Sequence, residues 1–373
     1  MSAAANKLAR VREELNRIFL ERTELIDGAL VALISASHVL IVGPPGTAKS
    51  MLADELCQRV ESTDYFQWLL TKFSTPEEIF GAVSLKGLEE DDYRRVTDHK
   101  LPQAHIAFLD EIFKANSSIL NALLTIINER FFHNGRRRVA VPLISLFGAS
   151  NELPDEDELT ALYDRFMLRF MVDYLSEDFR FLKMLEGAET AGRTMLSFAE
   201  LQELSDAARA IDVPGGILRA IAELRRELIR QQIVVSDRRW HNALSVLRAH
   251  ALVMERSVVN EDDLLFLEHV LWKDPEERPK VRDTLRHMLK GYEEEARELL
   301  IQSEELRDYA GRKWDSEELQ RRAQVEAHTK LANILAKFEN LLRDAAESGR
   351  AMTTVEAMRS RVREIQQGML RQL

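Results

Sequence analysis

The sequence predicts an α/β fold in which helices cover both faces of a mostly parallel β-sheet. The main evidence is a repeated pattern in which an apolar segment ends in a polar tip, as at residues 37–42, 106–109 and 143–150. Strands that are apolar along their whole length are typical of parallel sheets that are buried on both faces. From about residue 176 onward these segments cease and helical periodicity replaces them.

We expect three parts, divided where this pattern changes. They are an αβα domain at residues 1–190, an all-helical domain at residues 191–274 and a C-terminal region of long helices at residues 275–373. The second part has four expected helices, at residues 197–211, 214–232, 237–256 and 261–272, with caps at Ser197, at Ser236 or Asp237, and at Asn260. The expected linker is DPEERP at residues 274–279, and the spaced apolar residues after it predict an antiparallel helical hairpin or short bundle.

The composition is that of a soluble globular protein. The chain has 373 residues, of which 45% are hydrophobic and 30% are charged, and its net charge is −11. A negative field opposes phosphate backbones, which disfavours broad binding to nucleic acid or anionic membranes. The single cysteine, Cys57, excludes an internal disulfide and fits a reducing compartment. No signal peptide and no apolar run long enough to span a bilayer is evident, so we expect a cytoplasmic protein.

The first apolar strand, which follows two expected helices at residues 7–36, leads into a candidate phosphate-binding loop, GPPGTAKS, at residues 43–50. Strand, glycine-containing loop and helix form the context that such a loop needs, although a strand-turn-helix with a chance Lys-Ser pair is the alternative. Lys49 can reach the β- and γ-phosphates, and the Ser50 hydroxyl can hold Mg²⁺. Ala48 replaces the usual glycine, so its backbone must adopt a conformation that tolerates a Cβ. The candidate nucleotide-binding residues are Gly43, Pro44, Pro45, Gly46, Thr47, Ala48, Lys49, Ser50 and Met51.

A second site begins where the apolar segment 106–109 ends in Asp110 and Glu111. This places two carboxylates at the carboxyl edge of the sheet, where ligands bind in open α/β folds. Asp110 can hold Mg²⁺ through water beside Ser50, and Glu111 can polarise the water that attacks the γ-phosphate. Ordinary surface acids at a strand end are the alternative.

Three further positions are candidate functional residues because of their order in the chain. Asn151 follows the strand at residues 143–150, and its neutral amide can orient the attacking water or detect the γ-phosphate. Arg165, or Arg169 as the alternative, can act as a finger on a neighbouring subunit's γ-phosphate. Arg238, or Arg239 as the second choice, can contact the phosphates from the helical domain. A turn residue and salt-bridged surface arginines are the alternatives at these positions.

In this order the motifs resemble those of AAA+ ATPases, specifically the MoxR family and, within it, the RavA branch, which commonly has alanine at the position of Ala48. The resemblance extends over about residues 7–273. It is carried by residues 20–22 (LER), 43–50, 73–81 (FSTPEEIFG), 108–112 (FLDEI), 120–130, 149–154 (ASNELP), 162–166 (LYDRF) and 235–240 (VSDRRW).

The resemblance implies an ATP-binding αβα domain, a helical lid and hydrolysis of Mg-ATP at the subunit interfaces of a hexameric ring. It assigns the roles of Walker A lysine to Lys49, Walker B pair to Asp110 and Glu111, sensor 1 to Asn151, arginine finger to Arg165 and sensor 2 to Arg238. Family members act as chaperone-like ATPases, commonly with a partner that carries a von Willebrand factor A domain. The C-terminal part departs from the RavA type, because residues 280–373 show no β-patterned segment that matches its small β-rich domain.

Asn134 and Gly135 predict a β-hairpin at residues 131–141, with three arginines at residues 136–138. This basic hairpin can grip an acidic client or nucleic acid, or it can be a solvated turn or a subunit contact to the acidic residues 89–92. We therefore keep three hypotheses: a ring ATPase that remodels a protein partner, a nucleic-acid motor or loader on the same core, and a nucleotide-gated assembly scaffold.

Overall fold

The computed structural model describes residues 2–153, 162–187, 193–289, 292–312, 314, 316–347 and 352–370. The chain forms two compact units, residues 1–281 and residues 282–373, and each is described by itself. Among the described residues, no helix combines the length and the apolar character that crossing a membrane requires.

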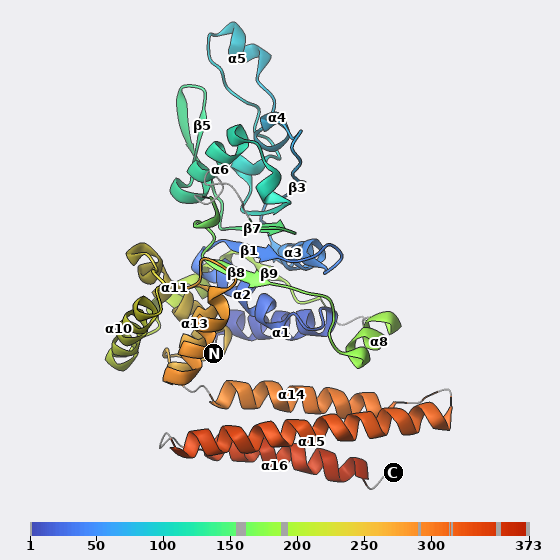
Figure 1. Ribbon diagram of the computed structural model, residues 1–373. Coiled ribbons are helices and arrows are strands. Elements are labelled where there is room, and N and C mark those ends of the chain that lie inside the picture. Colours follow the sequence, from blue (N-terminus) through green and yellow to red (C-terminus); the bar gives the residue numbers. More distant parts are fainter. Residues whose placement is uncertain are drawn as a thin grey trace. The chain divides into compact units, whose positions relative to one another are not determined.

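The first unit is organised around a five-stranded sheet with the strand order β3-β4-β7-β1-β8, in which all neighbours run parallel (Figure 1). All residues of β1 and β7 are buried, which confirms that the sheet is covered on both faces. The strands are β1 (Val39–Val42), β3 (Tyr65–Leu69), β4 (Ile106–Asp110), β7 (Ser145–Ser150) and β8 (Leu168–Met171).

Two strands differ from the sequence-based prediction. β8 is not among the apolar segments that predict strands, and it pairs with β1 along its whole length. The expectation that strands cease after residue 176 is wrong at β9 (Leu196–Ser197), which pairs with β2 (Val60–Glu61). A strand of two residues is too short to leave a period-2 pattern in the sequence.

The helices of the αβα part pack closely on this sheet. α2 contacts β1 and β8, and α3 contacts β4 and β7. Gly28 allows the close approach of α2, because a Cβ at this position would lie 2.0 Å from the ring of Phe170. The helical elements are α1 (Ala3–Ile18), α2 (Thr23–Ser35), α3 (Lys49–Cys57), α4 (Pro76–Phe80), η1 (Leu101–Gln103), η2 (Ile112–Lys114), α6 (Ser117–Glu129) and α8 (Asp178–Glu186).

The helical part that follows has three of its predicted caps in place. The side chains of Ser197, Ser236 and Asn260 each accept a backbone N–H bond at a helix start. The predicted helix at residues 261–272 is wrong in its extent, because it ends at Leu265 and continues as a 3₁₀ turn that stacks His269 on Phe170. The elements are α9 (Phe198–Ala210), α10 (Gly215–Arg230), α11 (Asp237–Val253), α12 (Glu261–Leu265) and η3 (Phe266–His269).

The predicted linker at residues 274–279 is partly helical, since α13 (Glu277–Leu289) begins inside it. The domain boundaries near residues 190 and 274 stay predictions.

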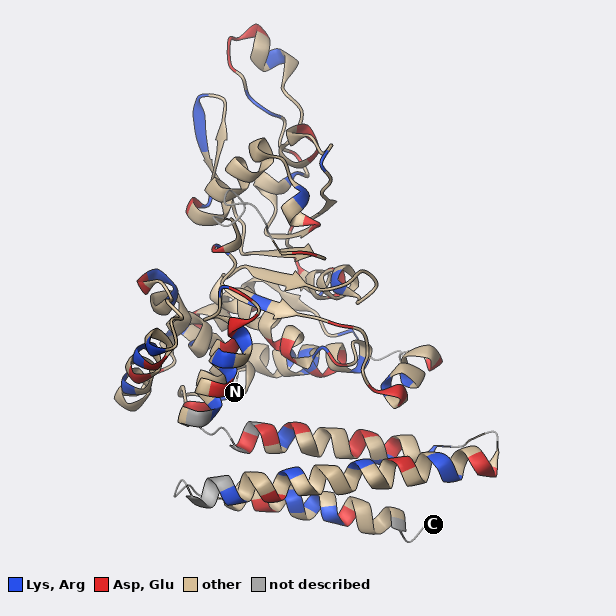
Figure 2. Cartoon of the chain, in the orientation of Figure 1, with Lys and Arg blue, Asp and Glu red and all other residues tan. Residues whose placement is uncertain are grey.

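The basic hairpin forms as predicted, from β5 (Phe131–Asn134) and β6 (Arg137–Ala140). Its turn lies against the insert at residues 81–101, which contains the short helix α5 (Leu85–Glu89) (Figure 2). Asp92 Oδ1 accepts a hydrogen bond from the Arg136 N–H at 3.3 Å. The acidic residues 89–92, which are one of the alternative subunit contacts for the hairpin, thus include a residue that contacts it inside one chain.

Among the described residues of the second unit, three long helices contact one another, which confirms the predicted helical bundle. Its core is apolar, with Leu331, Phe338 and Val362 fully buried. The helices are α14 (Tyr292–Gly311), α15 (Glu317–Glu347) and α16 (Thr353–Leu370).

Candidate functional site

The loop between β1 and α3 leaves the sheet at its carboxyl edge. Gly43 donates its N–H to the Ser150 carbonyl at 3.0 Å, and a Cβ at Gly43 would lie 2.1 Å from the Val172 carbonyl oxygen. Only glycine fits at that position. β1 lies between β7 and β8 at the point where the strand order reverses, which is where open α/β sheets bind their ligands.

Ala48 precedes α3 with a left-handed backbone, at φ +62° and ψ +23°. The expectation of a conformation that readily tolerates a Cβ is therefore wrong, because this one costs a non-glycine residue about 1–2 kcal/mol. Strain of this kind persists where the surrounding structure fixes it, and it is common in ligand-binding loops.

The Lys49 ammonium is held by three acceptors at the same edge. Its Nζ donates to the Gly43 carbonyl at 2.6 Å, to the Pro44 carbonyl at 2.9 Å and to Asn151 Oδ1 at 3.0 Å. Burial lowers the pKa of Lys49, whereas Asp110 and Glu111 raise it and so favour the charged form. The lysine is thereby placed next to the end of β7.

Asn151 connects this lysine to Glu111. Its Nδ2 donates to Glu111 Oε1 at 2.5 Å, while Lys114 Nζ lies 3.1 Å from Glu111 Oε2. Glu111 itself has a left-handed backbone, at φ +52°, directly after β4. Lys49 at the start of α3, Asn151 after β7 and Glu111 after β4 thus form one hydrogen-bonded chain.

Asp110 and Ser50 carry oxygen ligands of the kind that would hold a magnesium ion. Asp110 Oδ1 accepts the Glu111 N–H at 3.0 Å, which leaves Oδ2 for a metal-bound water. Ser50 lies in the first turn of α3, and hydroxyl and carboxylate oxygens are the ligands that Mg²⁺ prefers. The positive end of α3 and the loop N–H groups suit phosphate.

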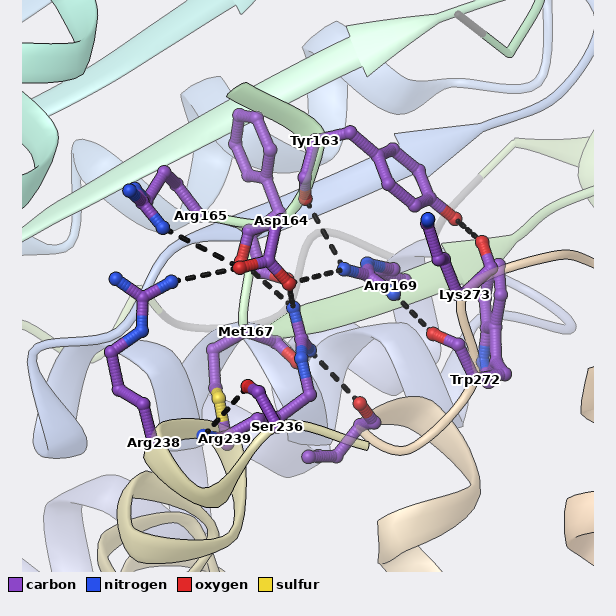
Figure 3. A network of polar contacts seen from close by, with 12 residues as sticks. Tyr163, Asp164, Arg165, Met167, Arg169, Ser236, Arg238, Arg239, Trp272 and Lys273 are labelled. Carbon is purple, nitrogen blue, oxygen red and sulfur yellow. Dashed lines mark hydrogen bonds and ion pairs between the residues drawn. The ribbon is translucent and has the colours of Figure 1, made fainter. Parts of the chain in front are cut away.

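A second cluster gathers four arginines around one carboxylate, and we call Asp164 with Arg165, Arg169, Arg238 and Arg239 the arginine hub (Figure 3). Asp164 Oδ2 lies 2.8 Å from Arg238 Nη2 and 3.4 Å from Arg165 Nη1. Asp164 Oδ1 lies 3.3 Å from Arg239 Nη2 and 3.9 Å from Arg169 Nη2. One edge of the carboxylate thus faces Arg238 and Arg165, and the other faces Arg239 and Arg169.

Arg169 and Arg239 are buried structural residues. Arg239 donates to the carbonyls of Met167 at 3.0 Å and Val270 at 2.9 Å, and Arg169 donates to those of Trp272 and Tyr163. Burial lowers the pKa of Arg169 to about 9. Side chains that are fixed in this way cannot extend to another subunit, so the geometry favours Arg165 and Arg238, which are partly exposed, as finger and sensor 2 candidates.

The structure therefore brings Lys49, Asp110, Glu111 and Asn151 together and places Arg165 and Arg238 in a separate cluster. Among the residues that the structure describes, no hydrogen bond or ion pair joins the first group to the second. Two contributors were not predicted. Lys114 lies three residues after Glu111, a spacing at which side chains on a helix contact each other. Asp164 directly precedes Arg165, the finger candidate.

Comparison with known proteins agrees with this geometry. Residues 6–207 match the family model described as the MoxR domain in the MoxR-vWA-beta-propeller ternary systems, and residues 216–285 match an AAA lid domain. The chain belongs to the MoxR family of AAA+ ATPases. The motif-based recognition of this family is thus confirmed, while the assignment to the RavA branch stays a prediction.

Individual relatives of this MoxR-family chain are both archaeal and bacterial. An uncharacterized protein of Methanocaldococcus jannaschii is 42% identical over 276 residues, which cover 74% of this chain and 72% of that protein. The chaperone MoxR1 of Mycobacterium tuberculosis is 30% identical over 183 residues, 48% of this chain and 47% of the relative. A crystal structure of a candidate ATPase from Cytophaga hutchinsonii superposes with a TM-score of 0.62, at 17% identity, over 77% of this chain and 94% of that one, which supports the AAA+ fold.

Proposed function

We propose that this MoxR-family protein hydrolyses Mg-ATP at the carboxyl edge of its central sheet. The observation that carries the proposal is the hydrogen-bonded chain from Lys49 through Asn151 to Glu111. It joins a cation that suits phosphate oxygens to a carboxylate that can take a proton from water.

Each residue has a distinct role in this proposal. Lys49 exchanges its bonds to the loop carbonyls for bonds to the β- and γ-phosphates, and residues 43–51 surround the nucleotide. Ser50 and Asp110 hold Mg²⁺, which neutralises phosphate charge when it is bound. Glu111 accepts a proton from the attacking water, and Asn151 fixes the orientation of Glu111.

The decisive test is Glu111→Gln, measured for ATP binding and for steady-state turnover. The amide keeps the shape of the side chain but cannot act as a base, so binding should persist and turnover should fall to background. Hydrolysis near the original rate in this variant would remove Glu111 from its role.

We further propose that the site is completed by a neighbouring subunit in a homo-hexameric ring. Arg165 is the finger candidate, because its side chain is partly exposed and, within the described part of the chain, is held by an exposed ion pair to Asp164 at 3.4 Å. Arg165→Ala should lower turnover while an isolated subunit still binds ATP. A large loss of ATP affinity by the isolated subunit would instead place Arg165 at its own site.

The partner that we propose is a protein with a von Willebrand factor A domain, on which this ATPase acts as a remodelling or activating chaperone. Support comes from the matched family model, whose description names MoxR-vWA systems, and from the relative named a chaperone. A pull-down with the Glu111→Gln variant and ATP should retain such a partner. The cytoplasmic location stays a prediction.

Two alternatives have weaker support. The nucleic-acid motor is supported by the basic hairpin, but Arg136 contacts acidic residues of the same chain. Its backbone N–H donates to the side chain of Asp92, and its guanidinium donates to the carbonyl of Asp91. Stimulation of the ATPase activity by nucleic acid, with a steep salt dependence, would favour the nucleic-acid motor. The assembly scaffold predicts that removing residues 282–373 abolishes partner binding and leaves ATPase activity intact.

A further inference from the structure

The arginine hub joins the αβα part of the chain to its helical lid through one carboxylate. Asp164 and Arg165 lie just before β8, whereas Arg238 and Arg239 lie in the first turn of α11. Figure 3 shows all four guanidinium groups directed at Asp164. This residue has no role in the proposed catalytic machinery, yet it contacts both of its arginine candidates.

We call the Oδ1 side of Asp164, which faces the buried Arg239 and Arg169, its inner edge, and the Oδ2 side, which faces Arg238 and Arg165, its outer edge. The contacts at the inner edge are held by further hydrogen bonds. Arg239 is buried and also donates to the carbonyl of Phe166 at 3.1 Å and to the carbonyl of Asp164 itself at 2.9 Å. These backbone bonds hold Arg239 whether or not the Asp164 carboxylate is charged. The lid attachment therefore does not depend on the outer edge of that carboxylate.

The ion pairs at the outer edge of Asp164 can be replaced by other charge interactions. The side chains of Asp164 and Arg238 are 42% and 51% exposed, and that of Arg165 is 26% exposed. Exposed ion pairs are weak and are readily replaced by a competing charge. An anion with more charge than one carboxylate, such as a terminal phosphate, can therefore draw Arg238 away from Asp164.

The hub also carries an excess of positive charge. Four guanidinium groups surround one carboxylate, and the proximity of Arg238 lowers the pKa of Arg165 in addition to the effect of burial. Glu277 acts on Arg169 from farther out and raises its pKa. An unbalanced cationic cluster of this kind favours the approach of a polyanion.

We propose that Asp164 is a positioning residue that holds Arg238 and Arg165 in the absence of nucleotide, and that ATP of the same subunit displaces Arg238 whereas ATP of the neighbouring subunit displaces Arg165. This inference rests on the proposed function, since it requires ATP to bind at the site of Lys49. Part of the binding free energy of ATP is then used to break the ion pair between Asp164 and Arg238, the sensor candidate in the lid. Because Asp164 also contacts Arg165, it links the sensor candidate to the finger candidate.

The test is the ATP affinity of the full chain in a Glu111→Gln background, which prevents turnover. Asp164→Asn removes the charge, but its Oδ1 can still accept a bond from Arg239. We expect ATP to bind about two- to fivefold more tightly, the range that corresponds to the loss of one exposed ion pair. ADP should gain less, because it lacks the γ-phosphate.

Three controls separate storage from a structural role. Asp164→Glu keeps the charge and should bind ATP like the parent. Asp206→Asn, which removes another exposed Arg–Asp pair in α9, should also leave binding unchanged. In an Arg238→Ala background, Asp164→Asn should no longer tighten ATP binding. Asp164→Ser removes the same charge and replaces Asp164→Asn if that variant does not fold.

Unchanged or weaker ATP binding in folded Asp164→Asn would overturn the storage role, as would tightening that persists without Arg238. If the chain with Glu111 intact binds and turns over ATP in either case, the proposed function still stands. If the parent binds no ATP at all, both inferences fall together.

Discussion

The side-chain amide of Asn151 donates to Glu111 Oε1 across 2.5 Å, and its oxygen accepts from Lys49 at 3.0 Å. Asn151 therefore orients the candidate base and contacts the candidate phosphate ligand at once. A neutral donor is required here, because a second carboxylate would repel Glu111.

Replacing Asn151 with Asp should lower kcat by about 10- to 100-fold, because a hydrogen bond to a charged group is worth about 1.5–3 kcal/mol and each 1.36 kcal/mol is about tenfold in rate. ATP affinity should change less, since Lys49 and the backbone of the loop still bind the phosphates. Steady-state kinetics and nucleotide titration measure the two effects. Asn340→Asp, on the exposed surface of α15, is the matched control and should behave like the parent. An unchanged kcat in Asn151→Asp would remove this residue from the site.

The two arginines at the start of α11 should differ in how strongly their truncation lowers stability and ATP turnover. Arg239→Ala leaves several buried carbonyls without their donor, so it should lower the free energy of unfolding by roughly 3 kcal/mol or more. Arg238→Ala loses one exposed ion pair and should lower it by less than about 1 kcal/mol, but it should reduce ATP turnover. Denaturant unfolding and ATPase assays on both variants separate these outcomes. Equal destabilisation by the two substitutions would contradict the division of the hub into inner and outer edges.

Acid should destabilise the first unit through its buried histidines. Burial and the charge of Arg130 lower the pKa of His38 from 6.5 to about 3, and the ring accepts the Leu146 N–H at Nδ1. The unfolded chain takes up a proton below about pH 6.5 but the folded chain does not, so stability is fully present above that pH. It falls as the pH drops from about 6.5 to about 3, by up to roughly 1.4 kcal/mol per pH unit for this residue.

His38→Gln, whose side-chain oxygen can still accept the Leu146 N–H, should flatten this slope in a series of unfolding curves between pH 7 and pH 4. His133→Gln, at an exposed position of β5, is the control and should keep it. A parent slope that does not change in His38→Gln would show that another group takes up the proton.

The sequence predicts correctly that Lys49, Glu111 and Asn151 lie close together, for a physical reason, while phosphate binding at this edge stays a prediction. The carboxyl ends of parallel strands meet at one edge, so residues that follow β1, β4 and β7 must lie close together. Lys49 and Asn151 are 102 positions apart, yet both are placed by this rule alone.

The arginine hub was less predictable. Whether Arg165 or Arg169 is accessible depends on the carbonyl of Trp272, which comes from a turn that no local pattern places. Asp164 is an ordinary acid in the sequence, and it becomes a hub residue only because Arg238, 74 positions later, folds onto it. Such roles depend on tertiary packing, which local periodicity does not record.

Ala48 provides a prediction of gained stability. Its left-handed backbone, at φ +62°, costs alanine about 1–2 kcal/mol, and glycine adopts this conformation without that cost. Part of the gain is offset by the greater freedom of glycine in the unfolded chain, so Ala48→Gly should raise the free energy of unfolding by about 1 kcal/mol.

Ala222→Gly, at an exposed position inside α10, is the matched control with the opposite sign. There the backbone is helical, so the same change should destabilise the chain by about 1 kcal/mol. Denaturant unfolding of the full chain measures both. Loss of stability in Ala48→Gly similar to that in Ala222→Gly would mean that the left-handed conformation stores no strain. A gain in stability accompanied by slower ATP turnover would show instead that the strain fixes the loop for phosphate.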